Sequence, residues 1–373
     1  MKSFDWVNPY PSVRIPLFAR NVVSTSHPLA AQAGLRMLLK GGNAVDAAIA
    51  AAATIVLVEP VSCGLGGDCF AIVWDGKELH GLNSSGVAPA AWNVEYFKRK
   101  YGTGPDGLAI QPKRGWDSVT VPGVVAGWSA LHEKLGKLPF EQLFEPAIEI
   151  AERGYAVPPV VAHKWAAAAK ELSNQPGYAQ AFMPEGRAPK VGEHFRFPDA
   201  ANTLRRIAES HGRDFYEGEL AERIAAFAKE GGGAMTLEDL RGYRPEWVKP
   251  ISKSYRGYEL HEIPPNGQGI AALIALGIVE RFDMASLPVD SVQSQHVQIE
   301  AMKLAFADLY KYVADPRSME VTPEQMLSDG YLDSRAKLIR LDGATHFEAG
   351  RPHAGGTVYL TAADENGMMI SFI

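Results

Sequence analysis

The feature that most restricts the fold is a stretch that favours a helix and has almost no polar face. Residues 43–60 read NAVDAAIAAAATIVLVEP, with Asn43 suited to cap the start of a helix and Pro60 suited to follow its end. The apolar run from Ala47 to Val58 is too short to span a membrane. Because such a helix offers no face to water, other elements must cover most of its surface. The stretch therefore predicts a buried helix inside a layered protein.

Composition places the chain among ordinary globular proteins. It has 373 residues, of which 46% are hydrophobic and 21% are charged, so it can bury a large core. The net charge is −6 and no block of lysine and arginine stands out, which argues against nucleic acid as a partner. Residues 1–16 contain no apolar signal-peptide core, so we expect no membrane contact and a cytoplasmic location.

Helical and strand patterns are mixed along the chain rather than alternating regularly. Helices are predicted within residues 25–60, 124–153, 200–230, 269–282 and 294–315. A hairpin is predicted around Asp75-Gly76, and residues 252–265 alternate like one strand. Such a mixture favours an α+β architecture of stacked layers over an alternating βα fold.

Several motifs that suggest binding have plainer interpretations. GLGGD at residues 64–68 resembles a phosphate loop, but it lacks the Gly-Lys-Ser/Thr ending and leads into a predicted strand. His296 and Glu300 lie one helical turn apart, but no third metal ligand is evident, so we interpret them as a solvated helix face. Cys63 and Cys69 match no usual zinc spacing and are interpreted as reduced thiols.

The end of the chain, GGTVYLTAADENGMMISFI, predicts a hairpin whose tight turn contains Asn366-Gly367. Thr357 opens its first strand after a polar, glycine-rich loop at residues 340–356. A threonine hydroxyl is a weak nucleophile unless a base lies beside it, and an N-terminal threonine carries that base as its own α-amine. Taken alone, this stretch is compatible with either an ordinary strand start or a nucleophile released by cleavage after Gly356.

An ordered series of further motifs bears on that choice. They are LLKGGNAVDAAIAAA, VEPVSCGLGGDCFAIVW, SVTVPGVVAGW, the long segment FYEGELAERIAAFAKEGGGAMTLEDLRGYRPEWVKPISKSYRGYELHEIPPNGQG, and TVYLTAADENG. Together they resemble the γ-glutamyltransferase family, the γ-glutamyltranspeptidases or glutathione hydrolases, over nearly the whole chain. The resemblance extends to the branch that includes cephalosporin-acylase-like members.

The resemblance implies an N-terminal-nucleophile hydrolase with a four-layer αββα sandwich. It implies self-cleavage between Gly356 and Thr357, with residues 1–356 in the large subunit and residues 357–373 opening a small subunit. Thr357 would be the nucleophile, with its α-amine as base and no cofactor or metal, and Asp364 falls where the family pattern has an aspartate. In the family the oxyanion-hole glycines follow position 373, so we expect a truncated proenzyme that is inactive by itself.

One position departs from the family pattern. Ser85, in NSSGVAP, lies where γ-glutamyl enzymes carry an arginine that clamps the α-carboxylate of the substrate. Ser84 and Ser85 are equally compatible with a plain turn and with a pocket wall. Three functions stay open: an amidohydrolase or acyltransferase acting on a γ-glutamyl or similar small-molecule substrate, a glutaryl or cephalosporin-type acylase, and a non-catalytic relative.

Overall fold

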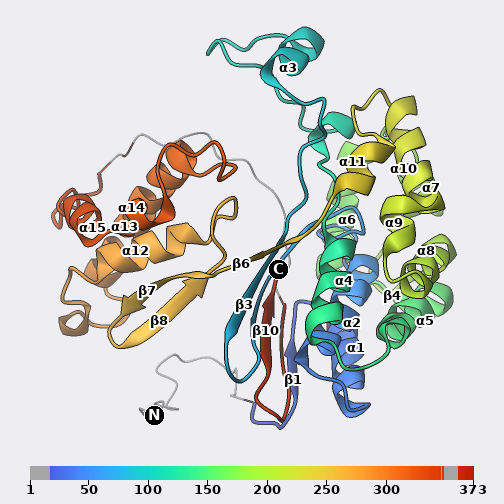
Figure 1. Ribbon diagram of the computed structural model, residues 1–373, viewed down its shortest axis with the longest axis horizontal. Coiled ribbons are helices and arrows are strands. Elements are labelled where there is room, and N and C mark those ends of the chain that lie inside the picture. The colour runs from blue at the N-terminus through green and yellow to red at the C-terminus, as the bar shows by residue number, and fades with distance from the viewer. Residues whose placement is uncertain (1–16, 346, 348–359) are drawn as a thin grey trace.

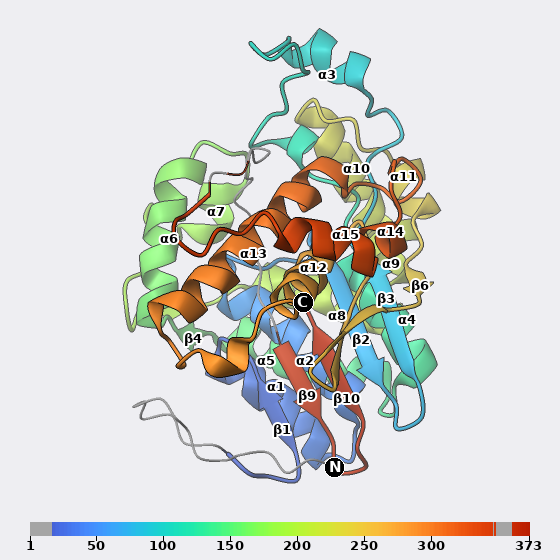
Figure 2. The same ribbon diagram turned by 90° about the vertical axis from the view of Figure 1, so that its left-hand side faces the viewer.

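A six-stranded antiparallel sheet organises the chain, which the computed structural model describes for residues 17–345, 347 and 360–373. In spatial order the strands are β1 (Val22–Ser24), β9 (Leu360–Ala363), β10 (Met369–Phe372), β2 (Cys69–Trp74), β3 (Leu79–Ser84) and β6 (Glu246–Val248). The final hairpin predicted from the sequence therefore forms, and it lies inside the sheet between β1 and β2 (Figure 1, Figure 2).

Helix α2 (Ala44–Val58) is the buried helix that the sequence predicts. All of its residues except Val56 are buried. It packs on β9 and β10 on one side, and on α1 (Pro28–Leu39), α4 (Val124–Leu135) and α5 (Glu145–Arg153) elsewhere. Burial of each valine, leucine or isoleucine contributes about 1.5–3 kcal/mol. The helix is thus the centre of the larger hydrophobic core.

Two side chains cap α2 reciprocally. Asn43 Oδ1 accepts a hydrogen bond from the Asp46 N–H at 3.0 Å, and Asp46 Oδ2 accepts one from the Asn43 N–H at 2.9 Å. The fully buried Asp46 carboxylate also accepts bonds from the N–H groups of Lys137 and Leu138, at 3.0 and 3.1 Å. One carboxylate therefore joins the start of α2 to the segment after α4.

A second group of helices lies on the same side of the sheet as α2 (Figure 1), and of these η2 (Phe140–Phe144) and α5 contact α2. The group comprises η2, α5, α6 (Pro159–Leu172), α7 (Tyr178–Phe182), α8 (Pro198–Glu209), α9 (Arg213–Glu217), α10 (Glu219–Glu230) and α11 (Leu237–Gly242). A short β4–β5 pair (Tyr155–Ala156 and His194–Phe195) joins this group. Helix α3 (Val94–Tyr101) projects from the body, and the turn η1 (Trp116–Ser118) follows it.

The rest of the chain builds a separate core on the opposite side of the sheet. A β7–β8 hairpin (Ile251–Tyr255 and Tyr258–Glu262) packs on α12 (Ile270–Val279). The other elements are η3 (Met284–Ser286), α13 (Val292–Tyr312), α14 (Pro323–Met326) and α15 (Asp329–Ala336). Figure 1 shows the resulting order of layers: helices, six-stranded sheet, hairpin, helices. The predicted α+β sandwich is confirmed.

Two local predictions need correction. Residues 252–265 contain two strands rather than one, because Arg256 and Gly257 both take positive φ, 48° and 85°, and reverse the chain. The face of α13 that carries Glu300 is covered rather than solvated: Glu300 is 1% exposed and accepts a hydrogen bond from the Thr345 N–H at 2.9 Å. His296 donates from Nε2 to the carbonyl oxygen of Arg340 at 2.7 Å. The segment that follows α15 thus lies on this face.

Within the part of the chain that the structure describes, no helix is long and apolar enough to cross a bilayer.

Replacement of Asp46 by alanine tests the link between α2 and the segment after α4. The change leaves three N–H groups without their acceptor, of which that of Asn43 is buried and those of Lys137 and Leu138 are partly buried. We therefore expect Asp46→Ala to lower the free energy of unfolding by about 3 kcal/mol. Urea denaturation measures it. Asp199→Ala, at an exposed position in the first turn of α8, is the control and should cost less than about 1 kcal/mol. Equal losses in the two variants would contradict the assigned role.

Candidate active site at one edge of the sheet

The antiparallel register gathers several strand ends at one edge of the sheet. Leu360, the first residue of β9, pairs with Phe372, which in turn pairs with Ala71. Cys69, the first residue of β2, pairs with Ser84, the last residue of β3. The start of β9 therefore lies at the same edge as the segment that carries Ser85. The predicted cleavage site, Gly356 and Thr357, lies outside the described residues, just before this strand.

Ser84 has a structural role at this edge of the sheet. Its buried hydroxyl donates to the carbonyl oxygen of Gly123 at 2.7 Å and lies 3.1 Å from the hydroxyl of Tyr243. A Cβ atom on Gly123 would overlap the carbonyl oxygen of Ser84, so this position requires glycine. The close approach seats the start of α4 against the sheet edge. For Ser84, the interpretation as a structural residue is therefore the better one.

Ser85 belongs instead to a half-exposed cluster of neutral polar groups. Its hydroxyl accepts a hydrogen bond from Asn266 Nδ2 at 3.0 Å, and its N–H donates to Asn83 Oδ1 at 3.1 Å. Asn83 Nδ2 donates to Asn266 Oδ1 at 2.8 Å and closes the ring of contacts. Within the described residues, no lysine or arginine hydrogen bonds to this cluster. Asn266 was not singled out by sequence reasoning, because its contact with Ser85 spans the two halves of the sandwich.

The glycine-rich turn at residues 64–68 also lies at this edge of the sheet, where it contacts the start of α4. The carbonyl oxygen of Gly67 accepts hydrogen bonds from the N–H groups of Gly123 and Val124, at 2.9 and 3.1 Å. The turn leads into β2 rather than a helix, as predicted, so it does not form a phosphate loop. Burial raises the pKa of Asp68, the last residue of the turn.

A cavity of about 360 Å³ opens beside this turn. Its walls combine apolar side chains from α2, α4 and the end of β10 with polar groups of the glycine-rich turn. They include Ile55, Val56, Cys63, Asp68, Trp128 and Ile373. Both cysteines are free thiols, as predicted. Burial and the nearby carboxylates of Glu59 and Asp68 raise the pKa of Cys63 to about 12, and burial raises the pKa of Cys69 as well. Neither thiol is therefore poised as a nucleophile at neutral pH.

Asp364 has a structural role in the described part of the hairpin. Its Oδ1 atom accepts hydrogen bonds from the N–H groups of Asn366 and Met368, at 2.9 and 3.1 Å. Its Oδ2 atom accepts one from the Ala44 N–H at 3.3 Å. The carboxylate thus ties the β9–β10 turn to the start of α2, at the end of β9 that is remote from Leu360.

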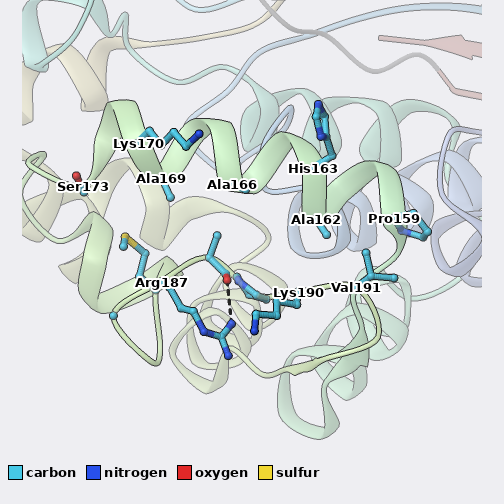
Figure 3. A pocket seen from close by; sticks show the side chains of 14 residues that line it. Pro159, Ala162, His163, Ala166, Ala169, Lys170, Ser173, Arg187, Lys190 and Val191 are labelled. Carbon is cyan, nitrogen blue, oxygen red and sulfur yellow. Dashed lines mark hydrogen bonds between the residues drawn. The ribbon is translucent and has the colours of Figure 1, made fainter.

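A larger cavity, of about 740 Å³, lies away from this edge (Figure 3). It is formed by Ala162, Ala166 and Ala169 of α6 and by the segment that contains Arg187 and Lys190. Arg187 is already paired with Glu193 at 2.8 Å. Because neither wall belongs to the six-stranded sheet, the cavity is not assigned to the candidate active site.

The chain belongs to the gamma-glutamyltranspeptidase family, whose model matches residues 30–373. Its backbone superposes on the crystal structure of cephalosporin acylase from Bacillus halodurans with a TM-score of 0.90 and 47% identity, covering 100% of this chain and 68% of that one. The fold class predicted from the sequence is thereby confirmed.

Curated relatives agree with this assignment. The chain is 35% identical over 358 residues to the glutathione hydrolase-like YwrD proenzyme of Bacillus subtilis (strain 168), covering 95% of this chain and 66% of the relative. It is 33% identical over 361 residues to the acylase ACY 1 proenzyme of Pseudomonas sp. (strain SE83), covering 95% and 64%. The chain thus spans slightly less than two-thirds of the length of these relatives.

The reactivity of Cys63 tests the electrostatics of the small cavity. Because its raised pKa keeps the thiol protonated at neutral pH, we expect alkylation by iodoacetamide to quicken about tenfold per pH unit from pH 7 to about 10, without a plateau. Peptide mapping by mass spectrometry measures the rate at Cys63. An unperturbed model thiol should level off above pH ~8.5. A plateau below pH ~9 at Cys63 would contradict the raised pKa.

Proposed function

We propose that the protein is a self-cleaving N-terminal-threonine amidohydrolase or acyltransferase. The observation that carries the proposal is the sheet register, because it brings the start of β9 to the edge that carries Ser85 and the glycine-rich turn. Thr357 precedes Leu360 by three positions, so the chain can carry it no farther than about 11 Å from that edge. Family membership and the proenzyme names of the relatives support the same chemistry.

Maturation proceeds in this proposal by an N-to-O acyl shift. The hydroxyl of Thr357 attacks the carbonyl carbon of Gly356, the C–N bond breaks, and an ester forms while the threonine amine becomes free. Water then hydrolyses the ester, so that Gly356 ends one chain and Thr357 begins the other. The freed α-amine titrates near pH ~7.7–8.0, which suits it to carry protons at working pH.

The mature enzyme then uses the same hydroxyl on a small-molecule amide. The α-amine of Thr357 removes the hydroxyl proton as the oxygen attacks the substrate carbonyl, and it delivers that proton to the leaving amine. Water hydrolyses the resulting ester, or an amine acceptor takes the acyl group. No step calls for a metal or an organic cofactor. The site residues, the division at residue 356 and the cytoplasmic location remain predictions.

The two candidate activities differ in the acyl group that the enzyme would accept. A γ-glutamyl substrate presents a free α-carboxylate, which is held best by a bidentate arginine. The neutral cluster of Asn83, Ser85 and Asn266 offers hydrogen bonds without a positive charge. A glutaryl group carries the same carboxylate and lacks only the α-amine, so the neutral cluster does not by itself separate the two groups. The second candidate function, an acylase acting on a glutaryl or related acyl group, is supported by the name cephalosporin acylase of the solved neighbour.

Cleavage at Thr357 is tested in the full-length gene product. We expect Thr357→Ala to remain a single chain and to lose amidase activity, because alanine supplies neither the attacking oxygen nor the hydroxyl for turnover. Denaturing electrophoresis and turnover of an anilide substrate measure the two losses. Thr361→Ala is the matched control: this threonine lies within β9, and its loss should leave cleavage intact. A Thr357→Ala protein that still matures would overturn the proposal.

Acyl specificity is tested at Ser85. Replacing Ser85 by arginine adds the missing cation, so kcat/KM for a γ-glutamyl anilide should rise about tenfold relative to Ser85→Gln. The glutamine variant also disturbs the contact with Asn266 but adds no charge, and it is therefore the matched control. An anilide of an acyl group without a carboxylate, such as butyryl, run in parallel reports the change in preference, and a glutaryl anilide, which has the carboxylate, should respond in the same direction as the γ-glutamyl anilide. Equal responses of the two variants would mean that position 85 does not face the acyl group.

A further inference from the structure

We propose that the turn between β2 and β3 carries a binding site for a divalent transition-metal ion of the Zn²⁺ class. The ligands are His80 Nε2, Asp75 Oδ2 and Glu78 Oε1. These three donor atoms all lie within 4.8 Å of one another, and they are the one such group of His, Cys, Asp and Glu side chains in the portion covered by the structure. Imidazole nitrogen with carboxylate oxygens is a donor set that suits Zn²⁺.

The distances between the donors fit a metal centre. His80 Nε2 lies 2.9 Å from Asp75 Oδ2 and 3.7 Å from Glu78 Oε1. Around a tetrahedral Zn²⁺ with bonds of about 2.0–2.1 Å, neighbouring donors are about 3.3 Å apart. The two observed distances lie on either side of this value. The third pair, Asp75 Oδ2 and Glu78 Oε1, lies within 4.8 Å, and rotation of the exposed Glu78 side chain can bring its carboxylate toward the other two donors.

Neighbouring groups hold two of the ligands, Asp75 and His80, in place before any ion binds. Asp75 Oδ1 accepts hydrogen bonds from the N–H groups of Lys77 and Glu78, at 2.8 and 2.9 Å, which turns Oδ2 toward His80. The His80 ring lies edge-on to Trp247 of β6, with centroids 6.3 Å apart. Such support around the ligands raises metal affinity, because little freedom is lost on binding.

One side of the cluster is protected and the other is open. The side chain of His80 is 8% exposed and that of Asp75 is 22% exposed, whereas that of Glu78 is 74% exposed. Water can therefore complete the coordination sphere from the solvent side. The cation of Lys134 lies 4.1 Å over the ring of Trp247, and no ion pair joins it to the three ligands in the described structure.

The turn lies at the opposite end of β2 and β3 from the candidate active site. Trp74 pairs with Leu79 next to the turn, whereas Cys69 pairs with Ser84 at the catalytic edge. Six-residue strands separate the two ends by about 17–20 Å. The proposed ion therefore stabilises the β2–β3 hairpin and takes no part in acyl transfer. The proposal is independent of the function assigned to Thr357.

Calorimetric titration of the metal-stripped protein with ZnCl₂ tests the site. We expect one Zn²⁺ per chain at the turn, an affinity lower by about tenfold or more in Glu78→Gln, and loss of this site in His80→Gln. Glu78 is exposed, so its variant should fold normally even if His80→Gln does not. His261→Gln is the matched control, because His261 lies 3.7 Å from Glu259 but belongs to no group of three such donors among the described residues.

Co²⁺ provides a second readout that does not depend on activity. Bound at the turn, it should give the absorption of a low-symmetry, four- or five-coordinate ion in the wild type and in His261→Gln, and not in His80→Gln. Absence of binding in the wild type would overturn the proposal. So would an affinity that is unchanged in Glu78→Gln, since the ion would then lie elsewhere on the chain.

Discussion

The burial of helix α2 is the constraint on which the rest of the structure depends. The helix presents no polar face, so the sheet must cover one side and the outer helices the others. Its first turn is fixed by three polar side chains, Asn43, Asp46 and Asp364, which satisfy N–H groups that would otherwise be buried without partners. Asp364 belongs to the last hairpin, so the end of the chain and the central helix stabilise each other.

This mutual support sets the register at the candidate active site. With the β9–β10 turn held at the start of α2, the two strands run between β1 and β2 and end at the glycine-rich turn. A one-residue slip would move the apolar side chains Ala362 and Ile370 out of the core. The packing of α2 therefore determines at which edge of the sheet β9 begins.

Local patterns in the sequence predicted the elements that depend on near neighbours. The run of alanines indicated the buried helix, Asn366-Gly367 indicated the last turn, and the ordered motifs indicated the family. Contacts between distant segments were not predictable in this way. Glu300 was predicted to face solvent because it is charged, yet it is buried on the same helix as Val297 and Leu304, and it accepts a hydrogen bond from the N–H of the distant Thr345. Likewise, nothing near Ser85 in sequence signals Asn266. The Asp75, Glu78 and His80 donors belong to one predicted hairpin, and sequence reasoning missed them because it did not consider this turn as a group of metal ligands.

The N-terminus of the smaller product is the measurement that tests the central claim most directly. Edman sequencing or terminal peptide mass analysis of the purified full-length protein should find a chain that begins at Thr357, with a partner chain that ends at Gly356. A single uncut chain that nevertheless hydrolyses amides, or a small chain that begins at any other residue, would contradict the account.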